Sequence, residues 1–329
     1  MGIDLKSSIN EIFKSKKDLI ALDDLEWDST LLKCDNALPI YSSRSLRYYS
    51  EYFEASHSYK YGILVEGELY AISCFHLTSD NLLTSSNGVI LPLFIRDVSD
   101  KLKIKIIKEF SKILNELSVL LERKINMYSN IFSSISDYTG LPKIIKNSAS
   151  VQSTFHWVSN IRPTIEEQKT EFRKSYKSLI NKGQRLFDVE KYHGSSEKLS
   201  LAFKAFRSLH LREAGKLTRS SKTWDIQLEM IMKKEAVLIL SYYENELIGG
   251  AIFQVNSLYA LYSVAAYRRD LFRLPIGHTI QFEAFKFFIN LGVKLYYLGE
   301  NYNGIDTKQS TISSFKEGFS NSIMLSISF

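Results

Sequence analysis

The feature that most constrains the fold of this sequence is a β-hairpin pattern that occurs once in each half of the chain. Residues 62–75 read GILVEGELYAISCF, and residues 238–253 read LILSYYENELIGGAIF. In each case two apolar strands flank a short polar turn, where Gly67 or Asn245 supplies the turn conformation. The equivalent glutamates of the two turns are Glu68 and Glu246. Two copies of one unit in the same order predict an internal repeat.

The segments that follow the two hairpins also match. Residues 101–122 have the periodicity of an amphipathic helix, and residues 124–130 read as a strand. In the second half, residues 276–291 predict a helix that Gly292 ends, and residues 294–300 predict the strand that corresponds to 124–130. The apolar stripe of this second helix consists of Ile276, Ile280, Ala284, Phe288 and Leu291. Each half therefore repeats a hairpin, a further strand, a helix and a closing strand.

Helices are predicted before the second hairpin. Residues 220–235 predict one helix, with Ser220 or Ser221 as its N-cap. Residues 165–185 predict another that ends near Gly183. Its apolar stripe consists of Phe172, Tyr176, Leu179 and Ile180, and its basic face of Lys174, Lys177 and Arg185. One face of a further helix carries Leu199, Phe203, Phe206 and His210.

Length and composition bound the function. The 329 residues predict two domains, 1–160 and 161–329, and the formal charge of +6 allows an anionic partner such as a nucleotide, a coenzyme or tRNA. The two cysteines, Cys34 and Cys74, lack a metal-ligand spacing, so we expect no metal. We expect no transmembrane segment, because the longest apolar runs, such as residues 258–267, are too short to span a membrane. We also expect no signal peptide, because the N-terminus lacks a long apolar core, and we expect no DNA partner. A cytoplasmic protein is predicted, with association at the inner face of the membrane left open, as is the oligomeric state.

The order of these elements resembles the GCN5-related N-acetyltransferase (GNAT) layout. The motifs within residues 157–319 resemble those of the Fem-type (FemAB-like) peptidyltransferases and the related polysaccharide-biosynthesis N-acyltransferases, which are tandem GNAT-like proteins. The motifs are FRKSYKSLINKG (172–183), LHLREAGKLTRSSKTWDIQLEMI (209–231), ELIGGAIF (246–253), RLPIGH (273–278) and FKEGF (315–319). The resemblance implies an α+β fold of two tandem GNAT-like domains. Each would have a mixed, mostly antiparallel sheet flanked by helices; the first would be a degenerate GNAT-like domain, and the second would carry the active site.

The resemblance further implies an amide-forming acyltransferase of the cell envelope. The donor would be acyl-CoA, such as acetyl-CoA, or alternatively aminoacyl-tRNA. The acceptor would be the amine of an amino sugar or similar glycan precursor, either small or linked to a lipid or nucleotide. Because no serine or cysteine nucleophile with a neighbouring base is evident, we expect direct transfer without an acyl-enzyme. A non-catalytic GNAT-like binding module remains a third hypothesis.

The loop at residues 268–278 is where a GNAT would hold the phosphates of its donor. Helix N-termini bind phosphate through free backbone N–H groups, and glycines allow the close approach. Here one glycine is present, so arginine side chains would take over part of that role. The candidate donor-phosphate residues are Arg268, Arg269, Arg273, Gly277, His278 and Lys177. The alternative is a solvated basic turn before a helix.

Two groups of residues are candidates for the chemistry and for the acceptor. His210 is a candidate base, and Arg219, Trp224 and Gln227 offer a charge, a stacking face and an amide for a sugar. The alternative for this group is a capped helix with its side chains in the core. Glu300, at the end of the strand over 294–300, is a second candidate for the general base that takes the proton of the amine, and which of the two residues is the base stays open. Its alternative is an exposed loop acid.

Two further residues complete the predicted acceptor site. Tyr297 is a candidate substrate contact and a weaker candidate, with Tyr302, for the acid that protonates the leaving group. Lys316 of FKEGF matches a position near the donor and acceptor in Fem-type enzymes, where a cation could neutralise a phosphate or the developing oxyanion. A solvated surface charge is the alternative.

Overall fold

The computed structural model describes residues 5–35, 37–79, 82–84, 88–131, 151–302 and 306–328, and these form two compact units. Unit 1 comprises Met1–Ala37, Tyr41–Thr154 and Met324–Phe329, and unit 2 comprises Leu38–Ile40 and Phe155–Ile323. The division therefore differs from the predicted ranges 1–160 and 161–329, because the end of the chain returns to unit 1. Among the described residues, no helix combines the length and the apolar character needed to cross a membrane.

Unit 1 is an antiparallel sheet covered on one face by two helices. The strands of this sheet pair in the order β1-β2-β3-β4, with β6 also on β3. A separate set of strands has β7 between β5, which is parallel to it, and β14, which is antiparallel to it. Phe13 of α1 and Phe110 of α4 pack with Phe75 of β3 in one buried cluster. The elements are α1 (Leu5–Ser15), β1 (Leu19–Ala21), α2 (Asp24–Leu31), η1 (Pro39–Tyr41, in unit 2 up to Ile40), α3 (Ser43–Tyr52), β2 (His57–Val65), β3 (Glu68–Leu77), β4 (Leu82–Leu83), β5 (Val89–Ile90), β6 (Leu93–Phe94), α4 (Asp100–Leu120), β7 (Met127–Ile131) and β14 (Ser322–Ser328, in unit 2 up to Ile323).

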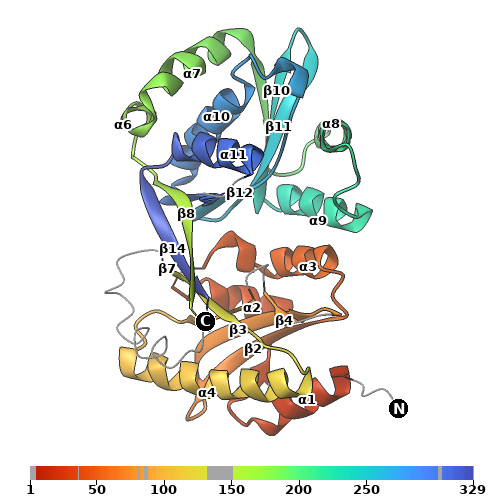
Figure 1. Cartoon of the computed structure of the whole chain (residues 1–329), viewed down its shortest axis with the longest axis vertical. Coiled ribbons are helices and arrows are strands. Elements are labelled where there is room, and N and C mark those ends of the chain that lie inside the picture. The colour runs from red at the N-terminus through yellow and green to blue at the C-terminus, as the bar shows by residue number, and fades with distance from the viewer. Residues whose placement is uncertain are drawn as a thin grey trace. The chain divides into compact units, whose positions relative to one another are not determined.

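Unit 2 is a mixed sheet with helices on both faces (Figure 1). Its strands lie in the order β8-β13-β12-β11-β10-β9, and all neighbours are antiparallel except β12 and β13. The elements are β8 (Gln152–Asn160), α6 (Ile165–Glu171), α7 (Lys174–Leu186), β9 (Asp188–Tyr192), α8 (Leu199–Ala214), α9 (Ser221–Met232), β10 (Ala236–Tyr243), β11 (Glu246–Val255), β12 (Tyr259–Tyr267), η3 (Arg269–Leu271), α10 (Ile276–Leu291), β13 (Leu295–Glu300) and α11 (Thr307–Glu317).

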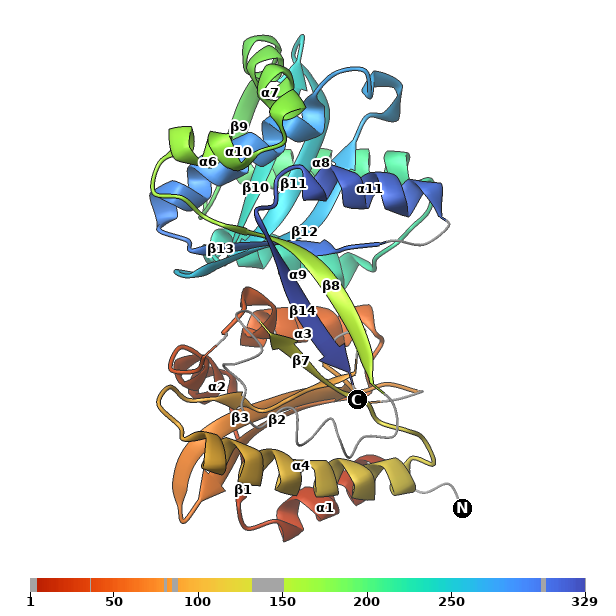
Figure 2. The ribbon, with the colours of Figure 1, turned by 60° about the vertical axis from the view of Figure 1, so that its left-hand side comes forward.

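Two adjacent glycines in β11 show how the layers of unit 2 approach the sheet. A Cβ on Gly249 would lie 2.5 Å from Ile276 of α10, and a Cβ on Gly250 would lie 2.7 Å from Phe206 of α8. Because successive strand residues face opposite sides, α10 covers one face and α8 covers the other (Figure 2). Both helices lie so close to the strand that larger residues would not fit.

The internal repeat is present residue for residue in the two hairpins. Ile63 pairs with Ala71 just before a bulge in unit 1, and Ser241 pairs with Gly249 just before a bulge in unit 2. The offset between these paired positions equals the offset between Glu68 and Glu246. The turn residues all have positive φ, as a two-residue type I′ turn requires: Glu66 (54°), Gly67 (85°), Glu244 (52°) and Asn245 (66°).

The repeat extends into the helices that precede the hairpins. The hydroxyl of Ser42 caps α3 by accepting from the N–H of Ser45, and Ser220 caps α9 in the same way through Thr223. These two caps are separated by the same offset as the hairpins. The predicted helix over 276–291 and its C-terminal Gly292, which has φ of 83°, are also confirmed. Leu291, predicted on the buried stripe of that helix, is 38% exposed instead.

The single helix predicted over 165–185 is wrong in two respects. Phe172 and Arg173 have extended backbones, so α6 and α7 are separate helices, and this break lets the Phe172 ring enter the core against Phe285. Gly183 lies inside α7 rather than at its end. A glycine stands there because a Cβ would lie 1.9 Å from Oγ1 of Thr279 on α10. That glycine serves close helix packing, which local sequence does not reveal.

Candidate active site

The strands β12 and β13 are paired over only part of their length. The parallel ladder joins Tyr259, Ala260 and Leu261 to Leu295, Tyr296 and Tyr297, and ends there. Beyond this point β12 continues with β11 as its partner, whereas β13 continues with β8. The last residues of β13 therefore lie where the sheet divides, and they include the predicted Tyr297 and Glu300.

Residues alternate between the two faces of β13. Tyr296 and Leu298 are fully buried in the cluster that includes Phe285 and Phe288 of α10. Tyr297 therefore points to the other face of the sheet, the one that α8 covers. A bulge between Tyr297 and Gly299 shifts the register, so that Glu300 is opposite His156 of β8.

Lys316 reaches this end of β13 from α11. A Cβ on Gly299 would lie only 2.5 Å from the Lys316 Nζ, so the ammonium lies directly beside that glycine. Burial lowers the pKa of Lys316 from its ordinary value, and the carboxylate of Glu300 opposes this shift. The ammonium forms no hydrogen bond or ion pair with the other residues that the structure describes. A largely buried cation that has a nearby carboxylate but no direct hydrogen bond or ion pair is costly, so the arrangement suits an anionic group brought by a substrate.

His156 joins the same group. Its Nδ1 lies 2.5 Å from the Tyr297 hydroxyl oxygen, and the side chain is 1% exposed. Burial, and secondarily the positive charge of Lys316, lower the pKa of His156 to about 4. The imidazole is therefore neutral at neutral pH. His156, Tyr297, Gly299, Glu300 and Lys316 form what we call the β13 cluster.

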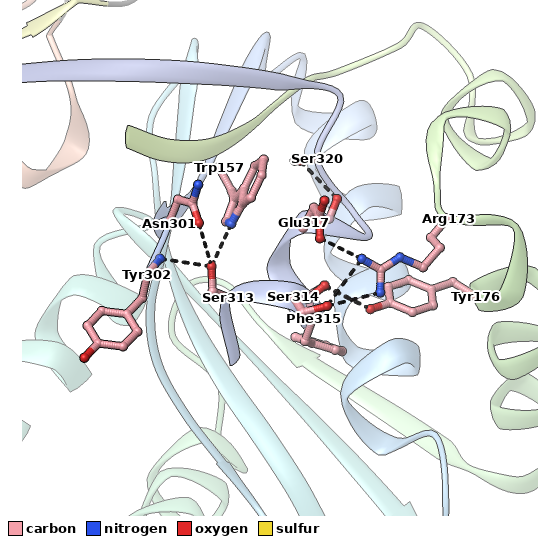
Figure 3. Close-up of polar contacts among 10 residues, drawn as sticks. All are labelled: Trp157, Arg173, Tyr176, Asn301, Tyr302, Ser313, Ser314, Phe315, Glu317 and Ser320. Atoms are coloured by element: carbon pink, nitrogen blue, oxygen red, sulfur yellow. Dashed lines mark hydrogen bonds and ion pairs between the residues drawn. The ribbon is translucent and has the colours of Figure 1, made fainter. Parts of the chain in front are cut away.

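One serine ties the chain after β13 to α11 (Figure 3). The hydroxyl of Ser313 accepts from the Trp157 indole N–H and from the Tyr302 backbone N–H, both at 3.0 Å. It donates to the Asn301 side-chain oxygen at 3.1 Å. Because Trp157 is on β8, this network fixes α11, and with it Lys316, against the strands that carry the cluster.

The C-terminal end of α11 is held by α7 (Figure 3). The Arg173 guanidinium pairs with the Glu317 carboxylate at 2.9 Å, and the Tyr176 hydroxyl donates to the Phe315 carbonyl at 3.3 Å. A Cβ on Gly318 would lie 2.2 Å from the Tyr176 ring. The FRKSY and FKEGF motifs therefore meet in space, and the glycine of the second allows the contact.

The predicted donor-phosphate residues are placed differently from one another. Arg268 is bound on both sides, to Glu246 at 2.6 Å and to Asp270 at 2.6 Å. The side chains of Arg269 and Arg273 belong to exposed residues, and Lys177 is half-buried on α7. The guanidinium of Arg268 is thus already paired with two carboxylates of the protein, whereas Arg269 and Arg273 are exposed to solvent.

The start of α10 is the second part of the predicted donor site. Pro275 is its N-cap and offers no side-chain hydrogen bond, so the amides of the first turn are not capped by a side chain. Phe315 packs on Gly277, where a Cβ would lie 3.1 Å from its ring. The His278 ring lies edge-on to Tyr176 and Phe315, and burial lowers its pKa to about 4. His278 is therefore a neutral ring among aromatics, not a cation for phosphate.

His210, Arg219 and Trp224 come together between α8 and α9. Arg219 Nη1 lies 3.2 Å from His210 Nε2, and both residues contact the Trp224 ring. Burial, with Arg219 as the second cause, lowers the pKa of His210 to about 4. Gln227, one turn along, is 1% exposed, and neither end of its amide has a hydrogen-bond partner among the described residues. This second group lies on the face of the sheet toward which Tyr297 points.

The structure therefore brings Tyr297, Glu300 and Lys316 together and adds His156, which sequence reasoning did not single out. The His156–Tyr297 contact joins residues 141 positions apart, and no local pattern marks the histidine. In the described part of the chain, no group of three or more His, Cys, Asp or Glu side chains is arranged to hold a metal ion.

Comparison with solved structures identifies the fold. FemX matches with a TM-score of 0.68 at 10% identity, over 95% of this chain and 97% of FemX. A tandem GNAT protein from the clavulanic acid biosynthesis pathway matches with a TM-score of 0.53 at 11% identity, over 94% of this chain and 97% of that protein. L-PGS from Bacillus licheniformis matches with a TM-score of 0.52 at 11% identity, over 98% of this chain and 91% of that protein.

The chain therefore has the Fem-like tandem GNAT fold, as the motifs predicted. No protein-family model and no curated protein matches the sequence. At these identities the likeness concerns the fold, so the activity has to be argued from the site.

Proposed function

We propose that this chain, which has the fold of FemX, is an N-acyltransferase that joins an activated acyl group to the amine of an amino sugar or similar glycan precursor. The observation that carries the proposal is the Lys316 ammonium, which is largely buried, lies near the Glu300 carboxylate and forms no hydrogen bond or ion pair with the described residues, at the point where β12 and β13 part. In this proposal the acyl donor is acyl-CoA, and the β13 cluster surrounds its reacting carbonyl.

The reaction needs one proton removed and one negative charge stabilised. Glu300 takes a proton from the acceptor ammonium, directly or through water, because only the free amine is nucleophilic. The nitrogen attacks the thioester carbonyl, and Lys316 stabilises the negative charge that develops on the oxygen. The C–S bond then breaks as the nitrogen gives up its second proton and the sulfur takes up one, so that an amide and the coenzyme A thiol are formed, and the proton held by Glu300 passes to solvent. The amides of Gly277 and His278 in the first turn of α10, which no side chain caps, are proposed to face the donor phosphates.

Direct transfer agrees with the state of the two cysteines. Both are free and buried, and burial raises the pKa of each thiol to about 12. Since the thiolate is the nucleophile, neither cysteine is suited to form an acyl-enzyme at neutral pH.

The acceptor is proposed to contact the group on α8 and α9. Arg219 is held over Trp224 and by His210, so its guanidinium has a defined direction. With a pKa of about 4, His210 is a weak base at neutral pH, and we assign it to orienting Arg219. Glu300 thus remains the proposed general base.

The test compares Lys316→Ala with Lys308→Ala, an exposed lysine on the same helix. Thiol release from acetyl-CoA is measured with a nucleotide-linked amino sugar as acceptor. We expect Lys316→Ala to lower kcat by about 10²–10³-fold, the range for removing one oxyanion-stabilising group, and Lys308→Ala to change it by less than about twofold. Equal activity of both variants would contradict the assignment of Lys316.

The donor is tested in the same experiment. Product that forms only with aminoacyl-tRNA and is lost after ribonuclease treatment would replace acyl-CoA as the donor. No acylated product with either donor would favour a non-catalytic binding module.

A further inference from the structure

His156 is a buried titratable group that the proposed reaction does not yet use. It is on β8, and in the register of the two strands it is opposite Glu300 of β13. Its ring lies 5.2 Å from the Tyr297 ring, centroid to centroid, and its Nδ1 lies 2.5 Å from the hydroxyl oxygen. This separation is at the short end for a hydrogen bond to a hydroxyl.

Lys316 and Glu300 define the surroundings of the His156–Tyr297 pair in the β13 cluster. Lys316 lies beside Gly299, which is the first paired residue of β13 after the shift in register. Burial, and secondarily the positive charge of Lys316, lower the pKa of His156. Burial also lowers the pKa of Lys316, and the negative charge of Glu300 opposes that shift. The Tyr297 hydroxyl is thus held by His156, and in the register of the strands His156 is opposite Glu300.

A neutral imidazole can hold the Tyr297 hydroxyl by a hydrogen bond without pairing with the Lys316 ammonium or repelling it. A carboxylate at this position would pair with the ammonium and neutralise it, and a cation would repel it. The imidazole carries no charge at neutral pH and still offers a ring nitrogen to the hydroxyl. The orientation of Tyr297 is then set by β8 rather than by solvent.

We propose that His156 is a positioning residue that holds the Tyr297 hydroxyl against the reacting group, beside Lys316. This inference rests on the proposed function, since it assigns Tyr297 a place in the same acyl transfer. In this proposal Tyr297 contacts the substrate through its oxygen, and His156 acts on the reaction through Tyr297.

A double-mutant cycle separates this role from a contact that only joins β8 to β13. The variants are Tyr297→Phe, His156→Phe, the double variant, and His156→Gln, which keeps a hydrogen-bonding side chain without a charge. We expect each Phe variant to lower kcat by about 10–100-fold, with the KM for acetyl-CoA unchanged. The double variant should match Tyr297→Phe within about threefold, and His156→Gln should stay within about threefold of the wild type.

Two kinetic outcomes would overturn the inference. If the two losses multiply in the double variant, His156 acts independently of Tyr297. If His156→Gln is as slow as His156→Phe, the ring matters for packing and not for the hydrogen bond. Thermal unfolding of every variant identifies a loss that comes from instability.

A measurement without substrate keeps this result distinct from failure of the proposed function. The protein has six histidines, so selective ¹⁵N labelling of histidine gives a readable NMR spectrum. We expect Tyr297→Phe and Lys316→Ala each to shift the ring nitrogens of His156, and Lys308→Ala to leave them in place. Unshifted His156 signals in Tyr297→Phe would overturn the inference, whereas shifted signals without any acyl transfer would count against the proposed function alone.

Discussion

At the scale of single residues, Gly299 decides where the candidate catalytic lysine can lie. Its φ is 114°, a region that glycine enters freely and other residues enter at a cost of about 1–3 kcal/mol. The space that a Cβ would occupy is filled by the Lys316 Nζ. The glycine therefore both shapes the bulge at the end of β13 and admits the ammonium.

We predict that Gly299→Ala lowers activity more than its effect on stability explains. The new methyl group would push the Lys316 ammonium away from the β13 cluster, and kcat for thiol release should fall by about 10-fold or more. Gly292→Ala is the matched control, because Gly292 also has a positive φ, 83°, but a Cβ there meets nothing within 4 Å. Similar unfolding free energies with unequal activities are expected. A Gly299→Ala variant with full kcat would show that the lysine position is not limiting.

At the scale of elements, the close contact between α7 and α10 depends on a glycine inside a helix. An alanine in a helix interior is ordinarily more stable than glycine by about 1 kcal/mol. At Gly183 the opposite sign is expected, because a Cβ would lie 1.9 Å from Thr279 Oγ1, and forcing atoms into a packed interface costs about 1–3 kcal/mol.

We therefore predict that Gly183→Ala lowers the free energy of unfolding by about 1–2 kcal/mol, measured by urea denaturation. The control is the double variant with Thr279→Ala, which removes the hydroxyl that the new methyl group meets. The loss caused by Gly183→Ala should be smaller in that background than in the wild-type one. A stabilising Gly183→Ala would mean that helix propensity outweighs the contact.

At the scale of the whole molecule, buried histidines make stability depend on pH. Burial lowers the pKa of His76 in unit 1 and of His156 in unit 2 to about 4 each. In the unfolded chain these rings take up protons as the pH falls through about 6.5, whereas in the folded chain they stay neutral down to about 4. The unfolded state binds more protons in this interval, so stability is fully present above pH of about 6.5 and is lost toward pH 4.

We predict that the free energy of unfolding falls between pH of about 6.5 and about 4, by up to about 3 kcal/mol for each of these two rings. Urea denaturation at several pH values measures the slope. The variants His76→Gln and His156→Gln should each show a shallower fall than the wild type. Parallel curves for all three proteins would contradict the linkage to these residues.

Local pattern was enough to predict much of the fold. The hairpins, the caps at Ser220 and Gly292, and the helix over 276–291 depend on residues close together in the sequence, so turn chemistry and periodicity reveal them. The repeat adds long-range information, because two copies of one pattern predict one architecture used twice. Local pattern failed at Phe172 and Gly183, where a buried ring and a close helix contact override helix periodicity.

The sequence by itself determined the hairpins, the repeat and most of the helices, because these follow from periodicities and turn residues that act over a few positions, while the tandem GNAT-like architecture was implied by the resemblance of its motifs. Only the tertiary structure decided which polar residues meet. It commits Arg268 to Glu246 and Asp270, and it brings His156 to Tyr297 and Lys316 to Gly299. These contacts depend on strand register and on the placement of helices from segments far apart in the chain. Because the partners are distant in sequence, the residues around each one do not reveal whether it is buried or paired with a charge.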